Sequence, residues 1–218
     1  MGLKRRGCEV LEYDSQARNR QGELPGSGRH QQGDGTHDEK TRAMIAIKNE
    51  FMDLNKNPLA NIGTTVGLVN KDNLFEWTAT ILGPTDTSYS SGLFILRIKF
   101  PINYPQKRPE VCFSTPIYHI NVKPSRPKSK QDEPLGHVCI STLNWWKPTS
   151  KIREVLTDIF ALFYMANPKS PYGLERGDEF NNNRNLYEEK VKYFTKKYAN
   201  PEICEKTYTN DWDFTYKK

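Results

Sequence analysis

Residues 74–100, LFEWTATILGPTDTSYSSGLFILRIKF, contain two runs in which apolar and polar side chains alternate. In the run 74–82 the side chains expected to face a core are Phe75, Trp77, Ala79 and Ile81. In the run 93–100 they are Phe94, Leu96, Ile98 and Phe100. A period of two is typical of a strand with one buried face, and Gly83-Pro84 separates the two runs. The stretch therefore predicts two neighbouring β-strands with a shared apolar face.

Shorter strand patterns lie on either side, at Thr64–Val69 and around Val111–Phe113. Four consecutive strands with short connections favour an antiparallel meander. Apolar residues at helical spacing precede the strands, in a helix that ends near Asn57-Pro58, and return in two further helices, 152–163 and 186–198. The order of helix, four strands, long loop and helices predicts an α+β fold.

The composition indicates how the chain is divided into domains and which kinds of partner it does not require. Of its 218 residues 36% are hydrophobic and 27% charged, which suits one domain with extra segments. We predict a flexible N-terminal tail at 1–37, a core domain at 38–200 and a short C-terminal extension at 201–218, because the tail has too few apolar residues to offset the entropy of ordering. No apolar run is long enough to span a membrane, and a net charge of +6 is too small to require a nucleic-acid partner. We expect neither kind of partner, and a location in the cytoplasm, the nucleus or both.

The long aperiodic stretch 115–148 contains the densest group of reactive side chains: His119, Asn121, His137 and Cys139. Loops of this length inside a domain are usually functional or disordered. Taken alone, a cysteine between Val138 and Ile140 is most simply a buried apolar side chain.

Three chemical alternatives compete with that interpretation of Cys139. A cysteine–histidine hydrolase would need a third group to orient its base, and the sequence offers none in a recognisable pattern. The histidine and cysteine spacing fits no structural zinc pattern, so we expect no metal. A thioester carrier needs an accessible thiol and an amide that can stabilise an oxyanion, and Cys139 with Asn121 would supply both.

Two longer segments carry a family resemblance. Residues 73–122, NLFEWTATILGPTDTSYSSGLFILRIKFPINYPQKRPEVCFSTPIYHINV, and residues 136–172, GHVCISTLNWWKPTSKIREVLTDIFALFYMANPKSPY, resemble ubiquitin-conjugating (E2) enzymes in content and order. The likeness runs from about Thr41 to Tyr198. It implies the UBC fold and the E2 reaction, in which ubiquitin is accepted from an activating enzyme (E1) as a thioester and passed, with a ligase (E3), to a protein substrate.

Matched by position, Cys139 is the thioester-forming nucleophile and Asn121 is the motif asparagine, which in the family stabilises the oxyanion or orders the active-site loop. His119 matches the motif histidine, whose usual role is structural. The resemblance implies no bound cofactor, since the activating enzyme consumes the ATP. The long loop is expected to form the active site.

The chain departs from the family pattern near the nucleophile. Ile120 replaces the motif proline, and the segment 123–134 makes the spacing before Cys139 longer than in many members. Ser141 and Ser170 stand where many members have aspartates that orient and deprotonate an incoming lysine. Because a hydroxyl carries no charge, we expect weak direct transfer to lysine and a bias toward HECT or RBR ligases, which accept ubiquitin on a thiol.

The partner surfaces also depart from the family pattern. Ile45 and Ala46 stand where members often have basic residues, and Gln106 replaces a large apolar side chain, while Lys48, Gln106, Lys147 and Pro148 remain candidate contacts for E1 and E3. Two alternatives stay open: a catalytically silent adaptor that binds ubiquitin or a ligase, and a carrier of a ubiquitin-like modifier.

Overall fold

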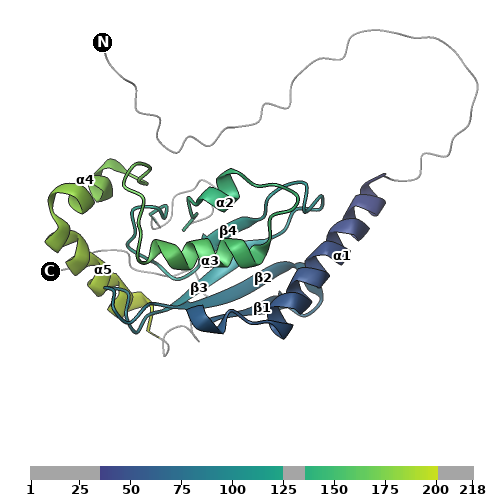
Figure 1. Ribbon diagram of the computed structural model, residues 1–218, viewed down its shortest axis with the longest axis horizontal. Helices are drawn as coiled ribbons and strands as arrows, with labels where there is room; N and C mark the ends of the chain where they lie inside the picture. The colour runs from purple at the N-terminus through teal and green to yellow at the C-terminus, as the bar shows by residue number, and fades with distance from the viewer. Residues whose placement is uncertain (1–34, 125–135, 201–218) are drawn as a thin grey trace, which may run out of the picture.

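The structure is a computed structural model that describes residues 35–124 and 136–200 (Figure 1). Its elements are, in chain order, α1 (Gly35–Lys56), the 3-10 turn η1 (Ala60–Ile62), β1 (Thr64–Asn70), β2 (Asn73–Leu82), β3 (Leu93–Lys99), β4 (Glu110–Phe113), α2 (Ser141–Asn144), α3 (Ile152–Leu162), α4 (Leu174–Asn182) and α5 (Arg184–Tyr198). This is the predicted α+β arrangement. Apart from 35–37, the expected tail lies outside the described residues, as do the extension 201–218 and all of the 123–134 insertion except Lys123 and Pro124.

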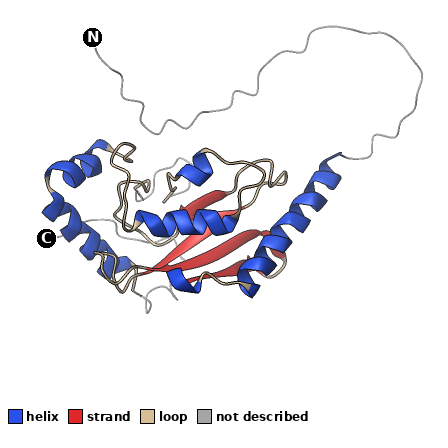
Figure 2. Cartoon of the chain, viewed as in Figure 1, coloured by secondary structure: helices blue, strands red, loops and turns tan. Residues whose placement is uncertain are grey.

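The four strands form one antiparallel sheet in the order β1-β2-β3-β4, the predicted meander (Figure 2). The pairing register puts the alternating apolar residues on one face, because Trp77 pairs with Ile98 and Ile81 pairs with Phe94. Phe113 of β4 extends this face from Leu96. A period of two in the sequence thus becomes one continuous apolar surface.

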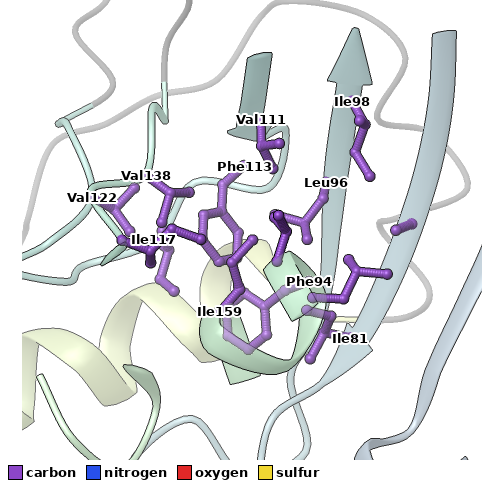
Figure 3. Packing of buried hydrophobic residues seen from close by; sticks show 14 of the residues in the cluster. Ile81, Phe94, Leu96, Ile98, Val111, Phe113, Ile117, Val122, Val138 and Ile159 are labelled. Atoms are coloured by element: carbon purple, nitrogen blue, oxygen red, sulfur yellow. The ribbon is translucent and has the colours of Figure 1, made fainter. Parts of the chain in front are cut away.

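Helix α3 covers that surface. Its buried side chains are Ile152, Val155, Leu156 and Ile159. Figure 3 shows Ile159 in one cluster with buried residues of β2, β3 and β4. Each fully buried side chain of this kind stabilises the fold by about 1.5–3 kcal/mol relative to exposure, and the helix therefore gives the loops at its two ends a rigid support.

Glu50 of α1 links that helix to α3. Its carboxylate accepts hydrogen bonds from the Tyr104 hydroxyl at 2.5 Å and from the Ile152 backbone N–H at 2.8 Å. The second bond satisfies a donor at the first residue of α3, where no carbonyl of the helix itself is available. A negative charge at a helix N-terminus also complements the helix dipole.

Helix α4 was not predicted. Its sequence LERGDEFNN has little apolar periodicity, and its first residue, Leu174, is 92% exposed. The helix instead packs on α5 through aromatic and charged side chains, with the Phe180 and Tyr187 rings 5.1 Å apart. No helix within the described residues is both long enough and apolar enough to cross a membrane.

Candidate active site

Cys139 lies in a short connection between the end of the β-bridged segment and α2. Val138 forms an isolated β-bridge with Val122, and the Cys139 N–H donates to the Asn121 carbonyl at 2.9 Å. The residue is 8% exposed. Cys139 is disulfide-bonded in the structure, and the thiol chemistry described below is that of the reduced protein.

The Cys139 sulfur has two polar side chains near it. The Asn144 side-chain amide donates to Sγ at 3.4 Å, and the Ser170 hydroxyl lies 4.0 Å from Sγ. Ser141, the other expected gate residue, is exposed at the first position of α2. The structure therefore brings Cys139 and Ser170 together, and adds Asn144, which the sequence did not indicate.

The Asn121 side chain is completely buried and holds the segment 167–172 between α3 and α4, which we call the gate loop. Its amide nitrogen donates to the carbonyls of Asn167 at 2.9 Å and Ser170 at 3.0 Å. Its amide oxygen accepts the Asn167 N–H at 2.7 Å. Both amide hydrogens therefore have backbone acceptors in the gate loop.

His119 is a buried residue with both ring nitrogens in use. Nδ1 accepts the Asn121 N–H at 2.9 Å, so the proton sits on Nε2, which donates to the Leu162 carbonyl at 3.0 Å. Burial lowers the pKa of His119 to about 4. The imidazole is therefore neutral at physiological pH and fixes the turn that presents Asn121.

Ile120 has a backbone N–H that a proline would lack. This buried donor is satisfied by the Tyr187 hydroxyl of α5 at 3.2 Å, while the Ile120 carbonyl accepts the Tyr172 N–H at 2.6 Å. Burial raises the pKa of Tyr187, so its hydroxyl stays protonated. A side chain 67 residues away in the sequence thus accommodates the departure from the family motif.

A charged cluster from α4 and α5 supports the same turn from behind. The Arg176 guanidinium donates to the carbonyls of His119 at 3.2 Å and Val122 at 3.3 Å, and lies 4.3 Å from the centre of the Tyr118 ring. The Tyr118 hydroxyl in turn donates to Glu179 at 2.6 Å. Burial lowers the pKa of Arg176, yet the two carbonyls and the aromatic face compensate its charge. The sequence of α4 has little apolar periodicity, so this cluster could not be predicted from the sequence.

The candidate contacts for E1 and E3 are exposed, and three of them lie on two linked loops. The Trp146 indole N–H donates to the Pro105 carbonyl at 2.8 Å, which ties the loop of Lys147 and Pro148 to that of Gln106. Lys48 is exposed on α1. Trp145 is 81% exposed beside this pair of loops.

Cys112 and His137 also have side chains that could act as a nucleophile or a base. Cys112 is buried, and burial raises the pKa of its thiol to about 12, so the thiol stays protonated at neutral pH. Burial also lowers the pKa of His137, whose backbone forms a β-bridge with Cys112. Within 35–124 and 136–200 no three His, Cys, Asp or Glu side chains are placed to hold a metal ion.

Comparison with known proteins identifies the family of the chain. The family model described as ubiquitin-conjugating enzyme matches residues 46–195. A protein of Arabidopsis thaliana named probable ubiquitin-conjugating enzyme E2 31 is 38% identical over 164 residues, which cover 75% of this chain and 96% of that protein. The chain belongs to the ubiquitin-conjugating enzyme family.

Proposed function

We propose that this protein is an active ubiquitin carrier in which Cys139 accepts ubiquitin from an activating enzyme and passes it on with a ligase. The observation that carries the proposal is the position of the sulfur: of the two described cysteines, which are equally buried, Cys139 is the one with Ser170 of the gate loop and Asn144 of α2 beside its sulfur, whereas Cys112 lies in β4. The Asn121 carbonyl accepts the Cys139 N–H at 2.9 Å, and His119 in turn accepts the Asn121 N–H at 2.9 Å, which supports the roles that the resemblance implies for these two residues.

In the charging step the Cys139 thiolate attacks the carbonyl carbon of the ubiquitin thioester on E1. A new carbon–sulfur bond forms, the bond to the E1 sulfur breaks, and that sulfur leaves as a thiolate. ATP is consumed earlier, by E1. The contacts of Asn121 support a role in ordering the gate loop, because both of its amide hydrogens are bound to carbonyls of that loop.

Transfer to a ligase thiol is the discharge route that these side chains favour. Ser141 and Ser170 supply uncharged hydroxyls where a carboxylate would help to deprotonate an amine. The Asp158 carboxylate, close to α2, already accepts the N–H of Thr142 at 3.4 Å and its hydroxyl. A lysine amine with a pKa of about 10.4 needs a base more than a thiol with a pKa of about 8.5 does. We therefore propose HECT or RBR ligases as partners.

A charging assay tests the carrier function. Reduced protein, E1, ATP and ubiquitin are combined and separated on non-reducing gels, with Cys139→Ser beside Cys112→Ala and Cys8→Ser. The expected result is a thiol-sensitive adduct that only Cys139→Ser abolishes or converts to a thiol-resistant ester. If ubiquitin gives no adduct but a ubiquitin-like modifier with its own E1 does, the protein is a carrier of that modifier. Absence with every modifier would favour the adaptor.

The preference for thiol acceptors has its own test. Charged protein is mixed with free lysine or free cysteine, and loss of the adduct is timed. We expect fast loss to cysteine and slow loss to lysine, and we expect Ser141→Asp with Ser170→Asp to raise the lysine rate toward the roughly hundredfold gain typical of a positioned base. Ser114→Asp, at an exposed position after β4, is the matched control. Rapid loss to lysine in the wild type would refute the preference.

A further inference from the structure

The side-chain amide that reaches the reactive sulfur belongs to Asn144 and not to the motif asparagine, and it lies closer to Sγ than the Ser170 hydroxyl does. Both amide hydrogens of Asn121 are bound to gate-loop carbonyls, at 2.9 and 3.0 Å. The Asn144 nitrogen lies 3.4 Å from Sγ and donates to it. An amide nitrogen has two hydrogens, so it can contact the sulfur and still serve an oxygen beside it.

Helix α2 holds Asn144 at that place. The Thr142 hydroxyl is bonded to Asp158 of α3, and the Leu143 side chain is 1% exposed. The Leu143 carbonyl accepts from Arg108 at 3.3 Å, and the Asn144 N–H donates to the Ile140 carbonyl at 3.1 Å. Asn144 itself is exposed, so its side chain is not needed to fill the core. The anchored backbone and the exposed amide together suit a residue that acts on a bound group.

We propose that Asn144 is a further catalytic residue, whose side-chain amide stabilises the Cys139 thiolate and the oxyanion of each acyl-transfer step. The inference rests on the proposed carrier function. On charging, the sulfur attacks the thioester carbon, the carbonyl oxygen takes the negative charge, and the E1 sulfur leaves as a thiolate. On discharge the acceptor attacks the same carbon, the bond to Sγ breaks, and Cys139 leaves as a thiolate. In both steps the amide faces the charge that develops at or beside Sγ.

Two substitutions separate the amide hydrogens from the shape of the side chain. Asn144→Leu removes the donor and keeps a similar size, and Asn144→Asp is nearly isosteric but replaces the donor with a negative charge. Asn182→Leu is the matched control, because the side-chain amide of Asn182 donates to Asp178 on α4. Thermal unfolding of each variant checks that the fold is unchanged.

The first measurement needs no ubiquitin. Reduced protein is alkylated with iodoacetamide across a range of pH, and the Cys139 peptide is quantified by mass spectrometry. Losing the amide should raise the apparent pKa of the Cys139 thiol in Asn144→Leu and raise it further in Asn144→Asp, whose carboxylate opposes the thiolate. The second measurement is the single-turnover rate of charging and of discharge to free cysteine. Removing one oxyanion donor lowers kcat by about a hundred- to a thousandfold in well-studied enzymes, and we expect a smaller loss, about ten- to hundredfold, because Asn144 is exposed to water.

The outcomes separate the two proposals. A wild type that forms no thioester overturns the carrier function, whatever the alkylation profile. A wild type that charges, with Asn144→Leu charging and discharging at the same rate, overturns the role of Asn144, even if alkylation shifts. Slow transfer in both Asn144 variants, with a raised thiol pKa and an unaffected Asn182→Leu, supports it.

Discussion

Removing the Tyr187 hydroxyl tests how the chain accommodates Ile120 in its active-site turn. Tyr187→Phe leaves the buried Ile120 N–H without its acceptor at 3.2 Å. A buried donor left unsatisfied costs about 1–3 kcal/mol. For a protein of this size each kcal/mol lowers the melting temperature by about 2–4 °C. We therefore expect a fall of about 2–12 °C and a lower midpoint of urea unfolding, measured by circular dichroism.

A double-mutant cycle isolates the hydrogen bond from other effects of the substitution. Ile120→Pro removes the N–H itself, so the same tyrosine change should cost about 1–3 kcal/mol less in that background. The Tyr187 hydroxyl also interacts with that of Tyr89, and this contribution cancels in the cycle. Tyr193→Phe, on the same helix, is the control: its hydroxyl accepts a hydrogen bond from Lys197 at 3.3 Å, so its cost should be the same, within about 0.5 kcal/mol, with Ile120 and with proline.

An equal cost of Tyr187→Phe with Ile120 and with proline would refute the reasoning. If Ile120→Pro does not fold, backbone amide exchange at Ile120 gives the same answer. The exchange should be faster in Tyr187→Phe than in the wild type, and unchanged exchange would contradict the bond.

Three further predictions concern stability. The buried His119 stays neutral down to about pH 4, whereas the same residue in the unfolded chain takes up a proton near pH 6.5. Its contribution to the free energy of unfolding is therefore complete above pH 6.5, and about 3 kcal/mol of it is lost as the pH falls to 4. In urea unfolding at several pH values, the stability of His119→Gln should depend less on pH than that of the wild type. Glu50→Ala should cost about 2–4 kcal/mol, because it leaves the Tyr104 hydroxyl and the Ile152 N–H unpaired. A loss no larger than that of Glu39→Ala, at an exposed position of α1, would contradict this link between α1 and α3. Gly83→Ala should cost about 1–3 kcal/mol of stability, because a Cβ at this position would lie 1.9 Å from the Tyr89 carbonyl oxygen. Gly67→Ala is the control: the nearest atom to its Cβ would be at 3.6 Å, so this variant should unfold at close to the wild-type urea concentration.

The sheet and α3 could be predicted from the sequence because their periodicities record which side of each element is buried. The alternation in 74–82 and 93–100 corresponds to the observed pairing of Trp77 with Ile98 and Ile81 with Phe94. Helix α4 escaped prediction because its contacts are made by charged and aromatic side chains, such as Arg176 over Tyr118, that leave no apolar stripe. Periodicity reports burial of apolar groups, and it says nothing about buried charge.

The candidate site, like the fold, could be predicted from the sequence only in part. The order of short motifs along the chain was sufficient to identify Cys139, Asn121 and His119 as candidates and to predict the family, which the comparisons confirm. Only the tertiary structure decided that the Asn121 amide is taken up by the gate loop, that Tyr187 satisfies Ile120, and that Asn144 reaches the sulfur. The first two contacts join residues 46 or more positions apart, and the third depends on a single helical turn. These contacts depend on how the packed elements orient directional polar groups, and the spacing of residue types along the sequence does not specify that orientation.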